Sequence, residues 1–199
     1  LQFEAGDRQT AYGPRSGVES GIETDRTGNI FGDPDAGLTV RVTAANSTAA
    51  DTTLRGTLAA SDFFDRTVCT RKISFPVGAG ASASRTVAEI AKGRRGFFRL
   101  RWTPATGTAV TPSLRCAVFE PHTGKDSVIG MNHAYGWPFL LQLSRTAGIT
   151  WFRDWSVKWH AVEPRRGAFD FSGTDRQVDR VLAAGLNVDL LFPFPAAGW

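Results

Sequence analysis

Two short junctions of nearly identical sequence constrain the fold of this chain more than any other feature. They stand 37 positions apart and read Ala147-Gly148-Ile149-Thr150 and Ala184-Gly185-Leu186-Asn187. In each junction a glycine follows a segment with helical periodicity and precedes an apolar run. Glycine is the residue best suited to the left-handed conformation that ends a helix, so each junction is predicted to connect a helix to a strand.

Helices and strands are expected to alternate around these junctions. One helix is predicted at 138–147, because Pro138 suits the first helical position, and a second at 174–184, where Ser172 and Asp175 have the spacing of a capping box. The predicted buried stripes are Phe139, Leu140, Leu143 and Ala147 in the first helix and Val178, Val181 and Leu182 in the second. Strands are expected at 127–132, 149–155 and 186–192. Since a helical crossover joins parallel strands, the segment predicts a parallel sheet, either a barrel or an open doubly wound sheet.

Before this segment, from residue 21 to residue 121, the pattern is all β. Apolar and polar residues alternate in short runs separated by turn residues, at 38–42, 53–60, 67–75, 85–91, 97–102 and 113–119. Short strands at this spacing are typical of an antiparallel β-sandwich. Cys69 and Cys116 lie on two of the runs. The sequence leaves open whether they form a disulfide or remain two buried thiols.

The composition argues against nucleic-acid and membrane partners. The net charge is +4, and no basic run interleaves with aromatic residues as a nucleic-acid groove requires. No stretch approaches the ~20 consecutive apolar residues needed to cross a bilayer. No Cys or His pair has metal-binding spacing, and no cofactor is implied. The strand expected to end at Asn132 is not followed by the G-x-G-x-x-G of a dinucleotide fold, which argues against a nucleotide-binding domain.

The segment after the first junction resembles a known family. It reads Trp151-Phe152-Arg153-Asp154-Trp155, then Trp159, Glu163-Pro164, Gly167, Phe169-Asp170-Phe171 and Asp175. This is similar to the second βα unit of retaining glycosidases of the large (β/α)8 clan, in both the β-xylosidase/α-L-iduronidase branch and the β-galactosidase branch. Gly130-Met131-Asn132 and the segment from Leu191 to Trp199 resemble the strand-one and strand-three ends of those families.

The resemblance implies a multidomain organisation of β plus α/β type. Residues 123–199 would be the first three βα units of an incomplete (β/α)8 glycosidase barrel, or TIM barrel, and residues 21–122 a β-sandwich before it. Residues 1–20 would be a linker and the end of an upstream jelly-roll module, since Leu1 to Pro14 resembles the closing strand of a carbohydrate-binding module. A piece of an exported enzyme, extracellular or periplasmic, is therefore expected.

The resemblance also implies where the catalytic groups lie. The clan uses two glutamates, which stand about 5–5.5 Å apart and follow strands four and seven, so none is expected within this chain. Glu163, the only glutamate between 121 and 199, is expected to brace the loop after it by a salt bridge. Arg153 is the candidate that orients the nucleophile, because a nearby cation lowers the pKa of a carboxylate. A surface salt bridge between Arg153 and Asp154 is the alternative.

Side chains that follow the expected strands are candidates for binding a sugar. They are Asn132, His133 and Tyr135 after the first strand, Arg153, Trp155 and Trp159 at and after the second, and Trp199 after the third. Active sites of such barrels form at the carboxyl ends of the strands, and aromatic rings offer flat apolar faces for packing. A structural role for His133 and a purely packing role for Trp159 are the alternatives.

The sequence thus favours a fragment of a secreted glycoside hydrolase that cleaves O-glycosidic bonds of a poly- or oligosaccharide with retention. The fragment alone is expected to be inactive, since both carboxylates of that reaction would lie elsewhere. The alternative is a non-catalytic carbohydrate-binding or structural module whose barrel is degenerate.

Overall fold

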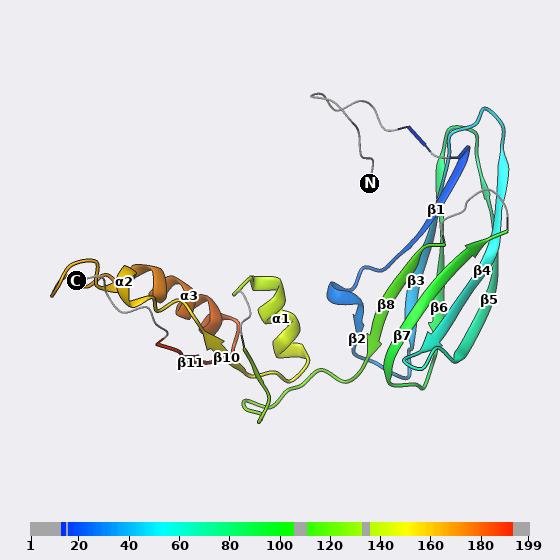
Figure 1. Cartoon of the computed structure of the whole chain (residues 1–199). Coiled ribbons are helices and arrows are strands. Elements are labelled where there is room, and N and C mark those ends of the chain that lie inside the picture. Colours follow the sequence, from blue (N-terminus) through cyan, green and yellow to red (C-terminus); the bar gives the residue numbers. More distant parts are fainter. Residues whose placement is uncertain (1–12, 15, 106–110, 133–135, 193–199) are drawn as a thin grey trace. The chain divides into compact units, whose positions relative to one another are not determined.

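The computed structural model divides the chain into two units, Leu1–Glu120 and Pro121–Trp199. It describes residues 13–14, 16–105, 111–132 and 136–192, and these are mostly β with few helices (Figure 1). The boundary expected from the sequence lies after residue 122. Each unit has its own core and is described by itself.

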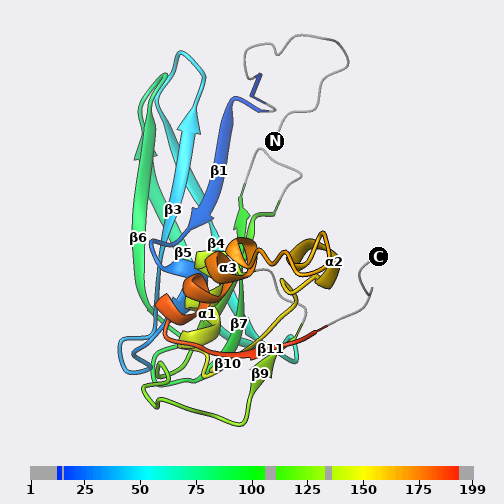
Figure 2. The ribbon, with the colours of Figure 1, turned by 90° about the vertical axis from the view of Figure 1, so that its left-hand side faces the viewer.

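Within the described residues, the strands of the first unit form two sheets (Figures 1 and 2). One sheet has the order β1-β3-β6 and the other β2-β8-β7-β4-β5. The bounds are β1 Val18–Glu23, β2 Ile30–Phe31, β3 Leu38–Asn46, β4 Thr52–Asp62, β5 Thr67–Val77, β6 Ser82–Ile90, β7 Gly96–Pro104 and β8 Ser113–Val118. The six runs expected from alternation are confirmed as strands β3 to β8, with somewhat different bounds.

One apolar core lies between the two sheets. Leu38, Val40 and Val42 of β3 contribute to it from one sheet, and Leu100 and Trp102 of β7 from the other. Successive side chains of a strand point to opposite faces. The alternating apolar residues of each strand therefore lie on one face, and this face packs into the core. Burying each large apolar side chain contributes about 1.5–3 kcal/mol.

The first unit differs from the expected antiparallel sandwich in two places. β1 begins at Val18, before the expected start at residue 21, and pairs with β3 along its whole length. β2 pairs with β8 in parallel. The 3-10 turn η1 (Thr27–Asn29) accounts for this pairing, because Asn29 has a φ of 56° and its Nδ2 donates to the Arg115 carbonyl at 3.0 Å, which fixes the turn beside β8.

The two cysteines are free thiols, which decides the alternative that the sequence left open. Cys69 of β5 pairs with Ala60 of β4, and Cys116 of β8 pairs with Phe98 of β7. β7 and β4 therefore stand between the two cysteine-bearing strands. At roughly 4.8 Å per strand spacing, those strands are about 14 Å apart, beyond the ~7 Å limit for a disulfide. Burial raises the pKa of Cys116 to about 12.

The described part of the second unit is a parallel sheet with helical crossovers (Figure 2). Its elements are β9 Gly130–Met131, α1 Pro138–Thr146, β10 Trp151–Asp154, α2 Trp159–Val162, α3 Ser172–Ala183 and β11 Asn187–Leu190. The strand order is β11-β10-β9, and both pairings are parallel, as the two junctions predicted. Among the described residues, no helix has the length and apolar character needed to cross a membrane.

The junction glycines end the helices as predicted, whereas the predicted capping box is wrong. Gly148 and Gly185 have φ values of 81° and 74°, in the left-handed region. Ser172 is already the first residue of α3, and Phe171 before it makes no side-chain cap. Asp170 takes the capping role, because its Oδ1 accepts the N–H of Ser172 at 2.9 Å. Hydrogen bonds from the Ser172 side chain and backbone hold the pKa of Asp170 below its usual value.

The buried faces of the two longer helices are rotated relative to the predicted stripes. The buried residues are Leu141 and Ser144 in α1 and Thr174 and Val181 in α3, so the prediction for Val181 is confirmed. Phe139 and Leu182, both predicted to be buried, are each 53% exposed. The helices pack on Phe152 and Leu186 of the sheet side, and the position of these two residues selects the face that each helix buries.

We expect the two thiols to stay unpaired and to react at very different rates. Only a thiolate attacks a thiol reagent, and a pKa of about 12 for Cys116 leaves about a thousandfold less thiolate at pH 8 than an ordinary cysteine has. Modification of Cys116 should therefore require unfolding, while the half-buried Cys69 reacts in the native chain. Mass spectrometry after labelling with and without urea measures both rates. The Cys69→Ser variant is the control, and a disulfide formed in the native chain would contradict the prediction.

Candidate functional site

The sheet of the second unit has one face covered by helices and one face that the described helices leave open. Phe152 of β10 lies in the core with residues of α1 and α3. Trp151 and Arg153 point to the opposite face, because side chains alternate along a strand. The register places Asn187 beside Trp151 and Asp189 beside Arg153. The open face of the sheet therefore carries aromatic, cationic, amide and carboxylate groups.

A cavity of about 480 Å³ lies on this open face. Trp151 and Arg153 line it from β10, Asp189 from β11 and Asn132 from the end of β9. Its volume falls within the roughly 300–1,000 Å³ usual for small-molecule sites. Polar groups from three neighbouring strands thus converge on one hollow, which is the candidate site.

Arg153 contacts Asp189 and not Asp154. Its Nε lies 3.7 Å from Asp189 Oδ2. Asp154 is buried on the other face of β10, where its Oδ1 accepts the N–H of Ser156 at 2.9 Å, so the expected alternative of a surface salt bridge with Asp154 is wrong. Arg153 Nε is shielded from solvent and makes no hydrogen bond within the described residues. The Asp189 carboxylate stays within ion-pair distance of this nitrogen, and the N–H keeps the capacity to donate a hydrogen bond to an acceptor that enters the cavity.

Asp126 supports the site and was not singled out from the sequence. Its Oδ1 accepts the Trp151 Nε1–H at 2.7 Å and the Ser127 N–H at 2.8 Å. These bonds fix the indole of Trp151 on the open face. Neither Asp126 nor Asp189 belongs to a motif. Asp189 meets Arg153 through the register of β10 and β11, while Asp126 lies before β9 and meets Trp151 through a side-chain contact between distant residues.

Glu163 lies away from the cavity and closes a loop. It is 5% exposed, and its Oε1 accepts the Gly167 N–H at 2.7 Å. Gly167 has a φ of 79°, a left-handed conformation that suits glycine. The side chain thus bridges the turn that follows it, in agreement with the bracing role expected from the sequence, although this contact is a hydrogen bond to the backbone.

The tryptophans after β10 make contacts with protein groups. Trp155 Nε1–H donates to Asn132 Oδ1 at 3.3 Å, and Lys158 Nζ lies 5.6 Å from the centre of the Trp155 ring. Trp159 of α2 meets Phe169 edge-to-face, with ring centres 6.2 Å apart. The Phe169 contact supports a packing role for Trp159 in this loop.

Three of the expected sugar-binding residues, His133, Tyr135 and Trp199, lie outside the described residues. Their roles in sugar binding, and the convergence of His133 and Trp199 with Arg153 at the carboxyl ends of the strands, stay predictions. Asn132 and Arg153 do line the cavity, whereas Trp155 and Trp159 are not among its lining residues. Of the four expected side chains that the structure describes, two therefore meet at this cavity.

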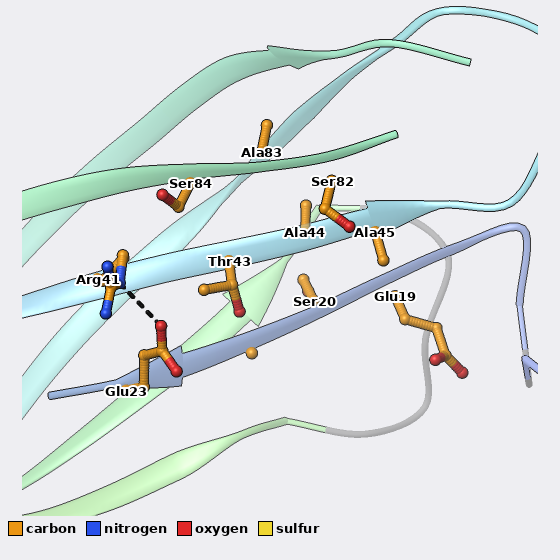
Figure 3. Close-up of a pocket in the computed structure, with 11 residues that line it drawn as sticks. Glu19, Ser20, Glu23, Arg41, Thr43, Ala44, Ala45, Ser82, Ala83 and Ser84 are labelled. Carbon is orange, nitrogen blue, oxygen red and sulfur yellow. Dashed lines mark hydrogen bonds and ion pairs between the residues drawn. The ribbon is translucent and has the colours of Figure 1, made fainter. Parts of the chain in front are cut away.

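The first unit carries a separate groove on the outer face of its β1-β3-β6 sheet (Figure 3). The groove has a volume of about 760 Å³, with Thr43 and Ser84 among the small side chains that line it. Glu23 and Arg41 border it and form an ion pair of 2.8 Å. Both side chains are about half exposed, where ion pairs contribute little stability. Of the described residues that line the groove none is aromatic, so it offers hydroxyls and charges but no ring for stacking.

A comparison with protein families relates the second unit to glycoside hydrolases. Residues 136–197 match the model of glycoside hydrolase family 42, described as beta-galactosidase. The matched segment runs from just before α1 to beyond β11 and is less than half of the chain. No curated protein matches the chain.

Solved structures show weaker likenesses. A family 39 glycoside hydrolase from Bacteroides cellulosilyticus WH2 is 19% identical with a TM-score of 0.49, over 73% of this chain and 29% of that one. A beta-glucosidase from Listeria innocua is 16% identical with a TM-score of 0.38, over 54% and 17%. A transglutaminase from red sea bream is 11% identical with a TM-score of 0.41, over 57% and 18%. This chain spans less than a third of each protein, and TM-scores below 0.5 support no conclusion about fold or activity.

Removing the Glu163 carboxylate is expected to destabilise the second unit. Glu163→Ala leaves the Gly167 N–H without this acceptor, a loss of about 1–3 kcal/mol, whereas Glu163→Gln keeps an acceptor and should cost less. The described α-helices lie in the second unit, so urea unfolding followed by circular dichroism at an α-helical band reports on it. Asp179→Ala, at an exposed acid of α3, is the matched control and should leave the midpoint near that of the wild type. An alanine variant at position 163 as stable as the wild type would rule out the bracing role.

Proposed function

We propose that the second unit begins the (β/α)8 barrel of a glycoside hydrolase and that its cavity is part of the sugar-binding site. The observation that carries the proposal is the family match over residues 136–197, which coincides with parallel strands joined by helices. Barrel active sites form at the carboxyl ends of the strands. Asn132 directly follows β9, and Arg153 is the next-to-last residue of β10. Both therefore stand at the end of the sheet where such a site is built.

The proposed reaction is hydrolysis of an O-glycosidic bond with retention. One carboxylate attacks the anomeric carbon while a second carboxylic acid protonates the leaving oxygen, and water then releases the sugar from the enzyme. We assign neither group to this chain, because Glu163 is engaged with its own loop. The proposed role of Arg153 is electrostatic. A guanidinium beside the nucleophile lowers the pKa of that carboxylate and keeps it ionised.

The substrate class and setting of the proposed enzyme rest on resemblance. β-Galactosides are the first substrates to test, because the matching family is described as beta-galactosidase. A secreted protein, extracellular or periplasmic, is part of the proposal, as is a non-catalytic sandwich at residues 21–122 preceded by the end of a jelly-roll module. Neither nucleic acid nor membrane is a proposed partner.

The full-length protein is expected to hydrolyse aryl glycosides, and this chain alone is expected not to. Two positioned carboxylates are the minimum for the proposed reaction. Both proteins would be assayed on aryl β-galactosides, β-xylosides and β-glucosides, with NMR of the first-formed anomer to report retention. Turnover by the 199-residue chain would show that its own residues supply the chemistry. A full-length protein that binds these sugars without cleaving any of them would favour a non-catalytic carbohydrate-binding module.

Replacing Arg153 in the full-length enzyme should move the acidic limb of its pH profile. A carboxylate nucleophile loses the cation that lowers its pKa, so in Arg153→Met the acidic limb of kcat/KM shifts to higher pH. Arg153→Lys keeps the charge and should shift it less. Arg176→Met, at an exposed arginine of α3, is the matched control. Loss of activity at every pH with an unmoved limb would remove the electrostatic role.

A further inference from the structure

A hydrogen bond connects the ends of two neighbouring strands beside the cavity. Asn132 directly follows β9, and Trp155 directly follows β10. The Trp155 Nε1–H donates to Asn132 Oδ1 at 3.3 Å. Because β9 and β10 are parallel, both residues leave the sheet at the same end, and the contact is a consequence of the strand pairing.

This bond fixes which way the Asn132 amide is turned. An indole N–H has a proton to donate and no lone pair to offer. The atom facing it must therefore be the amide oxygen, which settles an orientation that the shape of an amide leaves ambiguous. With Oδ1 engaged, the two Nδ2 protons of Asn132 are directed away from the indole.

The Trp155 ring contacts protein groups and does not line the cavity. Asn132 and Arg153 both line the cavity, and Trp155 is not among its lining residues. Lys158 Nζ lies over the Trp155 ring, 5.6 Å from its centre, where a cation is attracted to an aromatic face. The ring thus has a protein group over its face and its N–H on Asn132, an arrangement that suits support better than sugar stacking.

We propose that Trp155 is a positioning residue that holds the Asn132 amide so that its N–H donors meet an acceptor oxygen of a bound sugar. The inference rests on the proposed function and deepens it, since it replaces the stacking role expected for Trp155. The recognised group is a hydroxyl or ring oxygen of the glycoside, bound as a hydrogen-bond acceptor. Arg153 supplies N–H donors to the same cavity. This side of the site would therefore bind oxygen atoms of the sugar that accept hydrogen bonds.

A double-mutant cycle in the full-length protein tests the inference. The probe is an aryl 1-thio-β-galactoside, together with the corresponding xyloside and glucoside, and the Kd is measured by calorimetry. Asn132→Ala and Trp155→Phe should each weaken binding about 3- to 10-fold, the effect of one lost hydrogen bond. The double variant should bind no more weakly than Asn132→Ala alone, because Trp155 acts through Asn132. Trp137→Phe, at an exposed tryptophan before α1, should leave the Kd unchanged.

The cycle separates this inference from the proposed function. Fold-changes that multiply in the double variant would mean that Trp155 touches the sugar itself, which overturns the inference and leaves the proposed function standing. A wild-type protein that binds none of the three probes overturns both.

The hydrogen bond can also be tested without a sugar in the 199-residue chain. Solvent exchange of the Trp155 indole proton, followed by NMR, should be about 3- to 10-fold faster in Asn132→Ala than in the wild type, in line with one lost hydrogen bond. An unchanged exchange rate would overturn the positioning role.

Discussion

The parallel pairing of β10 with β9 and β11 is the constraint on which the second unit depends. Parallel neighbours require crossover connections, and here helices provide them and pack around Phe152. Covering that face of a four-residue strand leaves Trp151 and Arg153 to the other face, where they line the cavity. The same alternation of side chains therefore produces both the apolar core and the candidate site.

Features that belong to one residue or one run could be predicted from the sequence, while features that depend on distant partners could not. Gly148 and Gly185 mark the helix ends in the sequence, because glycine adopts the left-handed conformation without the steric cost that other residues incur. The cap of α3 was mispredicted because Asp170, two residues earlier than Ser172, already holds the first N–H. The helix faces were only partly predicted: Val181 is buried as expected, whereas Phe139 and Leu182 are exposed, because the position of the sheet selects which side of a helix is buried. Free cysteines followed only from the strand order.

The same distinction applies to the candidate site, where some residues could be predicted from the sequence and others could not. Position at the end of a strand was enough to bring Asn132 and Arg153 to one cavity. Two carboxylates near them meet their partners through contacts between distant residues, which no local motif records. Asp189 lines the same cavity and pairs with Arg153, and Asp126 accepts the indole N–H of Trp151. Arg153 keeps a shielded Nε without a hydrogen bond in the described part of the chain. This donor lies beside the Asp189 carboxylate and can form a hydrogen bond with an acceptor that enters the cavity.

A single tryptophan, Trp102, is placed so that its environment depends on the packing of the two sheets of the first unit. Trp102 is the only tryptophan in residues 1–120, its ring is fully buried, and its Nε1–H reaches Ser20 of the opposite sheet at 2.9 Å. Any separation of the two sheets breaks that bond and admits water to the indole. In a variant whose remaining tryptophans are replaced by phenylalanine, the wavelength of the fluorescence emission maximum would show whether the two sheets have separated.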